Sequence, residues 1–324
     1  MSSIHSRRDV LALALGAIGA PAFAQQPGDK TVKVILPNAT GSGVDAITRA
    51  AQPALAKALG ASVIVDNQPG AGGIVGLQAL ARSAPDGFTL SVVSNNVVIF
   101  PSVYKSIPFD MPGDFTPIAI VGATPIVIVV NPTKVPAKDH KEFAALLKAK
   151  PDEFTYGSGG NGTILHLTGE QYVGEIGAKA RHIPYKGVGA FVTDLIGGQI
   201  DFGTLALPSV QPHLKSGALR AIGVTTPQRV AAAPEIPTFV EQGLPHYTID
   251  AWFAVIGPKN LPAAEVQRVH AAVEAAFNDP AVKDAMARQG NVISVGPVDK
   301  AMPFFRSEMA RYAKLVKKAG VEVQ

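Results

Sequence analysis

The apolar positions near the start of the chain change from a strand pattern to a helix pattern. Thr31–Leu36 (TVKVIL) predicts a strand, and apolar side chains then recur at helical spacing from Val44 to Leu59. Ser42 followed by Asp45 three residues later is typical of a capping box, and Gly60 supplies a stop. We therefore expect a strand, a loop and an amphipathic helix in that order.

The same alternation continues along the whole chain. A Gly-rich loop, PGAGG at residues 69–73, opens a second predicted helix. A βαβαβ unit implies a parallel sheet with right-handed crossovers, whose ligands bind at the carboxyl ends of the strands. Further strands are predicted at 62–65, 89–93, 126–130, 154–156, 182–183, 199–205, 219–224 and 250–256, and further helices at 138–150, from 164, at 189–196, near 211, and at 262–277, 281–289 and 302–316.

The length of the chain favours a division into lobes. It has 324 residues, and single cores stop growing at about 250 to 300. Because no long Gly/Ser linker separates the two α/β sets, we expect the chain to cross between lobes twice, near Pro125 and Asp250. Residues 25–125 with 250–324 would form a discontinuous first lobe, and residues 126–249 the second.

Residues 1–24 have the features of an export signal peptide. A basic start precedes the apolar run VLALALGAIGA, and Ala22-Phe23-Ala24 is a small-x-small cleavage site. The run is shorter than the roughly 18 to 20 apolar residues of a membrane span. Arg7-Arg8 is similar to a twin-arginine motif, with Sec export as the alternative. We expect a mature protein that diffuses freely in a periplasm.

Composition and charge exclude several classes of function. The chain has no cysteine, which excludes disulfides, thiolate zinc sites, iron-sulfur clusters and a Cys nucleophile. The formal charge is +4, but the 29 Lys and Arg are scattered without a basic block. Nucleic acid is therefore not an expected partner.

The loop at residues 157–162, GSGGNG, formally matches the dinucleotide motif GxGxxG. The acid that holds the ribose in that motif is missing, because the next strand ends at HIPYKG with Lys186. Gly-rich turns at helix starts still expose N–H groups and a positive dipole end. We therefore interpret this loop as an anion-binding loop, together with TGSG at 40–43 and PGAGG at 69–73. A role as tight turns alone is the alternative explanation for the glycines in all three.

Catalytic and metal signatures are weak. His166 and Glu170 are spaced to share a helix face, but a third metal ligand has no local signature, and a hydrogen-bonded structural His is the simpler interpretation. Ser158 near His166 lacks an oriented third member of a catalytic triad. We expect no catalytic residue, no metal ion and no cofactor.

Taken together, the motifs resemble those of the Bug-type extracytoplasmic solute receptors of tripartite tricarboxylate transporters, over essentially all of the mature chain. The segments that carry the resemblance are DNQPGAGGIVG (66–76), APDGFTL (84–90), YGSGGNGTILHLTGE (156–170), IPYKG (183–187), DLIGGQID (194–201) and EIPTFVEQG (235–243).

The resemblance implies a two-lobed periplasmic binding protein fold of α/β class, type II-like, in which each lobe is a mixed, mostly parallel sheet flanked by helices. It also implies a monomer that closes over a small carboxylate and hands it to membrane permease subunits. A periplasmic enzyme acting on a small anion and a sensor subunit stay open as alternatives.

The resemblance also implies a site built from loops of both lobes. Backbone N–H groups and hydroxyls would hold the ligand. Asn95 and Asn96, at the end of the strand at 89–93, are candidate side contacts, with a turn role for asparagine as the alternative. The predicted ligand-binding residues are Asn38, Ala39, Thr40, Gly41, Ser42, Asn95, Asn96, Ser158, Gly159, Asn161, Thr163 and Leu205.

This sequence departs from the family pattern in two places. Its first loop has Asn38 and Thr40 where the family usually has an aromatic residue and then a proline, and Leu205 stands where an aspartate is usual. Because a leucine would leave a ligand ammonium unpaired in a closed cleft, the exchange predicts an amine-free carboxylate, aliphatic or aromatic, rather than an amino acid.

Overall fold

The computed structural model describes residues 30–321 and 323, so the predicted signal peptide lies outside the described residues. The strands form one ten-stranded sheet in the order β2-β1-β3-β9-β4-β7-β5-β6, with β8 and β10 paired to β4. Parallel pairs lie at both ends and antiparallel pairs in the middle. No helix of the described residues is long and apolar enough to cross a membrane.

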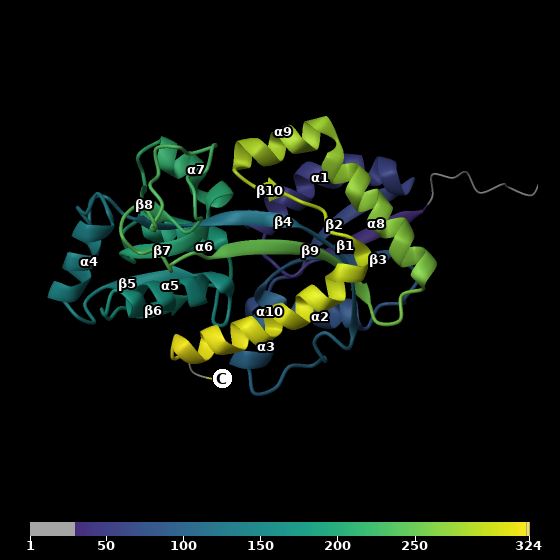
Figure 1. The fold of residues 1–324 in the computed structure, drawn as a ribbon, viewed down its shortest axis with the longest axis horizontal. Coiled ribbons are helices and arrows are strands. Elements are labelled where there is room, and N and C mark those ends of the chain that lie inside the picture. The colour runs from purple at the N-terminus through teal and green to yellow at the C-terminus, as the bar shows by residue number, and fades with distance from the viewer. Residues whose placement is uncertain (1–29, 322, 324) are drawn as a thin grey trace, which may run out of the picture.

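The first lobe combines the beginning and the end of the chain, as Figure 1 shows by colour. Its sheet is covered by helices on both faces, and its two parallel crossovers run through α1 and α2. The strands are β1 (Thr31–Leu36), β2 (Ser62–Asn67), β3 (Thr89–Ser94), β9 (Asp250–Pro258) and β10 (Val292–Ile293), and the helices are α1 (Gly43–Leu59), η1 (Ala71–Gly73), α2 (Ile74–Ala81), α3 (Asn96–Val103), α8 (Ala263–Asn278), α9 (Pro280–Gln289) and α10 (Val298–Lys318).

The second lobe repeats the α/β arrangement with the middle of the chain. In it, β5 pairs in parallel with both β6 and β7. Its strands are β5 (Thr155–Ser158), β6 (Arg181–Pro184), β7 (Phe202–Ala206) and β8 (Arg220–Val224), and its helices are α4 (His140–Ala149), α5 (Ile164–Glu175), α6 (Val188–Ile196) and α7 (Leu207–Lys215). The expected two-lobed α/β fold is present, and the strands of both lobes belong to one mixed sheet.

The long strand β4 (Phe115–Val130) connects the lobes. It pairs with β9 as far as the Pro125 and Asp250 positions, and from Ile126 onwards with β7 and β8. We propose that this change of partner marks the boundary between the lobes. The first lobe would then comprise residues 25–125 and 250–324, and the second lobe residues 126–249.

Local signals explain why α1 begins and ends where it does. The hydroxyl of Ser42 accepts the Asp45 N–H at 3.2 Å, and Gly60 adopts φ +60° at the C-terminal end. The Asp45 carboxylate accepts from the N–H of Gly41 at 2.9 Å, one residue earlier than a capping box requires. This arrangement fixes the loop between β1 and α1 against the start of the helix.

Two elements have no clear pattern in the sequence. Every residue from Asn96 to Phe100 in α3 is buried, so that helix shows no amphipathic period. The first part of β4 contains Pro117 and two register shifts against β9, which break the alternation expected of a strand. Both elements depend on tertiary packing, and α3 lies against α10.

Candidate ligand site between the lobes

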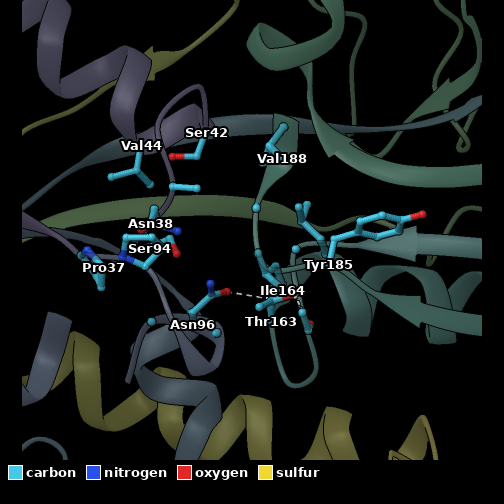
Figure 2. Close-up of a pocket in the computed structure, with 18 of the residues that line it drawn as sticks. Pro37, Asn38, Ser42, Val44, Ser94, Asn96, Thr163, Ile164, Tyr185 and Val188 are labelled. Carbon is cyan, nitrogen blue, oxygen red and sulfur yellow. Dashed lines mark hydrogen bonds between the residues drawn. The ribbon is translucent and has the colours of Figure 1, made fainter. Parts of the chain in front are cut away.

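A cavity of about 430 Å³ lies between the two lobes. Figure 2 shows residues of the first lobe on one side of it and residues of the second lobe on the other. Its lining is formed by Pro37, Asn38, Ala39, Ser42, Gly43, Val44, 69–73, Ser94, Asn96, Tyr104, Thr124, 159–161, 163–165, 184–188, Ala206, Ser209 and Ala251. The volume falls in the range of small-molecule pockets.

The loop between β1 and α1 forms the wall of the first lobe. The carbonyl of Asn38 accepts from the Asn67 side chain at 3.1 Å, which holds this loop against the end of β2. The side-chain oxygen of Asn38 is buried without a hydrogen-bond partner among the described residues. A buried acceptor of this kind is costly unless a ligand or a water molecule donates to it.

The segment Gly159–Thr163, here called the ligand loop, forms the opposite wall. Gly160 and Gly162 have φ of +122° and +69°, which explains the glycines. The Thr163 hydroxyl caps α5 by accepting the His166 N–H, and it donates to the Gly160 carbonyl at 2.8 Å. Within residues 30–321, the N–H groups of Gly159 and Asn161 have no protein acceptor. The ligand loop therefore presents free N–H donors beside a helix N-terminus, as a carboxylate requires.

Hydrogen bonds connect the lobes across the cavity. The hydroxyl of Tyr104 donates to the Asn161 carbonyl at 3.0 Å. The N–H of Ile164, in the first turn of α5, donates to the side-chain oxygen of Asn96 at 2.8 Å, the bond drawn in Figure 2. These bonds hold the ligand loop against the first lobe, so the structure has a closed cleft.

The charge of the lining has one sign. Lys186, from the turn after β6, is the charged residue of the lining, which includes no Asp or Glu among the described residues. The neighbouring Tyr185 points away and donates to Asp194 at 2.8 Å; burial and this bond raise its pKa to about 12. The cavity therefore matches an anion better than a cation.

Most of the predicted site residues come together around this cavity. Those in its lining are Asn38, Ala39, Ser42, Asn96, Gly159, Asn161 and Thr163. Those outside it are Thr40, Gly41, Asn95, Ser158 and Leu205.

The residues outside the lining have other positions. Thr40 and Gly41 are exposed. Asn95 is buried and donates to Tyr312 at 2.6 Å. Ser158 is 0% exposed and its hydroxyl lies behind the ligand loop.

Leu205 requires the clearest correction of the expected geometry. It is 0% exposed and packs in the core of the second lobe with Val127 and Val129. Because side chains alternate along a strand, the next residue of β7, Ala206, faces the cavity instead. The expectation of a ligand without an amine therefore cannot depend on Leu205.

Several lining residues were not predicted as contacts. Lys186 stood in the IPYKG motif, which could have suggested a cation at the cleft. Thr124 lies in β4 at the crossing between lobes, and its hydroxyl is buried without a partner among the described residues. Tyr104 reaches the cavity from the end of α3, an element without a clear sequence pattern.

A second cavity of about 730 Å³ lies at the edge of β4 between β8 and β10. Its arginines are already engaged, because Arg229 pairs with Glu241 at 3.0 Å and Arg311 with Glu308 at 3.2 Å. No group of three potential metal-ligating side chains occurs within the described part of the chain. The first cavity is therefore the better candidate for a ligand site.

Comparisons with known proteins agree with this geometry. The sequence model of the family described as "Tripartite tricarboxylate transporter family receptor" matches residues 47–321. Protein BugT of Bordetella pertussis is 32% identical over 314 residues, which is 96% of either chain.

Two solved structures are similar to this chain in fold over most of their length. R. palustris Rpa4515 with adipate has a TM-score of 0.87 and 25% identity, covering 92% of this chain and 99% of its own. MatC from Rhodopseudomonas palustris with bound malate has a TM-score of 0.81 and 27% identity, covering 88% and 98%.

Proposed function

Because the chain belongs to the family of tripartite tricarboxylate transporter receptors, we propose that it captures a small carboxylate between its lobes and delivers it to the permease subunits of such a transporter. The ligand is a di- or tricarboxylate or an aromatic carboxylate without an amine. The protein acts as a monomer in the periplasm, to which residues 1–24 direct it.

The observation that carries the proposal is the charge pattern of the cavity. One wall offers the free N–H groups of Gly159 and Asn161 at the start of α5, and Lys186 adds a positive charge. A carboxylate is the small ligand group that such donors bind well. An ammonium group would have no counter-charge in this lining and would lose its hydration on closure.

The relatives support the same class of ligand. Rpa4515 was solved with adipate and MatC with malate, and both resemble this chain along nearly its whole length. Both ligands carry two carboxylates and no amine.

The mechanism is hinge closure without covalent chemistry. In the open form the cavity is accessible, and a ligand that contacts both walls favours the closed form. The bond that the Ile164 N–H donates to Asn96 and the bond that the Tyr104 hydroxyl donates to Asn161 form when the lobes meet. The transporter then recognises the closed form, and the ligand leaves chemically unchanged.

The test is a thermal-shift panel of adipate, malate, citrate, benzoate, aspartate, glutamate and ATP on the mature chain. Ligand at one hundred times its Kd adds about 2.7 kcal/mol of stability, which is readily detected. We expect carboxylates without an amine to stabilise the protein and to be recovered unchanged. Stabilisation by ATP alone, or consumption of a carboxylate, would contradict the proposal.

A matched pair of variants tests the role of charge. Lys186→Gln should weaken binding of the best carboxylate about two- to tenfold, the modest effect of an exposed charge. Lys215→Gln, an exposed lysine outside the cavity lining, should leave the affinity unchanged. Equal affinities for both variants would remove Lys186 from the site.

A further inference from the structure

Two imidazole rings lie behind the ligand loop, and both come from elements that follow it in the sequence. His166 is in the first turn of α5 and His182 is in β6. Their rings stack with centroids 3.8 Å apart and an interplanar angle of 13°. Neither residue belongs to the cavity lining, so they contact the loop and not the space where a ligand would lie.

His166 is hydrogen-bonded to the ligand loop directly, and His182 is linked to it through Ser158, the residue before the loop. The Gly162 N–H donates to Nδ1 of His166 at 3.2 Å. Nε2 of His182 lies 2.7 Å from the Ser158 hydroxyl, which in turn accepts the Gly160 N–H at 3.2 Å. Together with the bond from the Thr163 hydroxyl to the Gly160 carbonyl, these bonds hold the backbone conformation of the two glycines.

The hydrogen bonds determine the tautomer of His166. Because Gly162 donates to Nδ1, that nitrogen carries a lone pair, and the proton of the neutral ring is on Nε2. Nε2 faces Glu170, whose carboxylate oxygen is 3.6 Å away and also accepts from the Tyr156 hydroxyl. Burial acts to raise the pKa of Glu170, but the nearby His166 ring and the hydrogen bond from Tyr156 outweigh it and hold the pKa below its ordinary value.

His182 stays neutral in this environment. Burial, followed by the effect of His166, lowers its pKa to about 3, although Glu170 acts in the opposite direction. A neutral ring can stack on His166 without charge repulsion and can keep its bond to Ser158.

The contact between Ser158 and His182 has the geometry of a nucleophile and a base, but the surroundings do not suit catalysis. Ser158 is 0% exposed and outside the cavity lining, so no bound ligand can reach its hydroxyl. The hydroxyl also bonds to both backbone polar groups of Gly160. The pair therefore holds the backbone and does not attack a substrate.

We propose that His166 and His182 are positioning residues of the carboxylate site: the stacked rings fix Gly160 and Gly162 so that the free N–H groups of Gly159 and Asn161 face the cavity. This inference rests on the proposed function for its consequence, carboxylate affinity, while the conformation of the loop can be measured without a ligand.

The first test uses the unaltered protein. Long-range ¹H–¹⁵N spectra of the histidine rings at pH 7.5 should show an unprotonated Nδ1 on His166, as the bond from the Gly162 N–H requires, and a neutral His182 ring. A His166 ring protonated on Nδ1 would overturn the proposal because it could not accept the Gly162 N–H.

The second test compares variants by hydrogen exchange of a peptide covering residues 157–164. His182→Ala should speed exchange in this peptide at least tenfold, whereas His182→Gln, which can place an amide near Ser158, should restore protection. His166→Ala and His166→Asn form the equivalent pair for Gly162. His246→Ala, at an exposed site, is the control. Unchanged exchange in the alanine variants, or no rescue by Gln and Asn, would overturn the proposal.

Calorimetry with malate and adipate completes the test. The alanine variants should bind the better of the two about tenfold more weakly, and the Gln and Asn variants within about threefold of the original protein. If the unaltered protein binds neither acid, the proposed function loses support, while the ring spectra and the exchange rates still decide whether the two rings position the loop.

Discussion

Removal of the Asn96 side chain tests how strongly the closed cleft depends on contacts between the lobes. Asn96 accepts the Ile164 N–H at 2.8 Å, and this bond joins α3 of the first lobe to α5 of the second. Both residues are buried, at 7% and 4% exposure. Asn96→Ala leaves that N–H without its acceptor in the closed form, whereas in an open form water can reach it.

The expected magnitude follows from the position of the bond. An unsatisfied buried donor costs about 1 to 3 kcal/mol. Because Ile164 lies at the cavity wall, water has partial access to its N–H, and we expect a cost in the lower part of this range, about 1 to 2 kcal/mol. If closure accompanies binding, this free energy appears in the affinity, which should fall about five- to thirtyfold.

The assay is calorimetry with the best carboxylate, together with small-angle scattering to follow closure. Gln52→Ala is the matched control, because Gln52 donates to the Val63 carbonyl at 2.7 Å within the first lobe. The control should lose stability but keep its affinity. Asn96→Ala that binds as tightly as the original protein, with the same ligand-induced compaction, would refute the reasoning.

Three further outcomes are expected. Thr163→Val removes the cap of α5 and the bond to Gly160, so thermal unfolding should show a loss of about 1 kcal/mol, and an unchanged Tm would contradict this. The pKa of His182 falls from about 6.5 in the unfolded chain to about 3 in the fold, so the unfolded state binds more protons between these values. The contribution of the neutral ring to the free energy of unfolding is therefore complete above pH 6.5, and about 2 kcal/mol of it is lost at pH 5. Urea unfolding at the two pH values should detect this loss, and His182→Gln should reduce it. Leu205→Asp should unfold the protein because it buries a charge in the core. Ala206→Asp should fold, and its selectivity, measured by calorimetry, should shift from malate towards aspartate. A Leu205→Asp protein that folds and shows that shift would restore Leu205 to the site.

Features with a local cause could be predicted from the sequence. Ser42 and Gly60 mark the ends of α1 because a cap and a left-handed glycine act within a few residues. The ligand loop was predictable for the same reason, since Gly160 and Gly162 occupy backbone conformations that other residues avoid. The order of strands and helices then brings the loops of both lobes to one cleft.

Features that depend on distant contacts could not be predicted. A one-residue uncertainty in strand register exchanges the two faces, which is why Leu205 was expected where Ala206 lies. Tyr104 and Asn161, which are 57 residues apart in the chain, meet only because the lobes close. The roles of the two histidines behind the ligand loop likewise depend on the pairing of β5 with β6.

The most direct test of the central claim is calorimetric titration of the mature chain with malate and with aspartate, which share a carbon skeleton and differ in a hydroxyl or an ammonium group. The cavity lining contains Lys186 and, among the described residues, no acid, so malate should bind at least tenfold more tightly than aspartate. Tighter binding of aspartate would contradict the assignment of the cavity to a carboxylate without an amine.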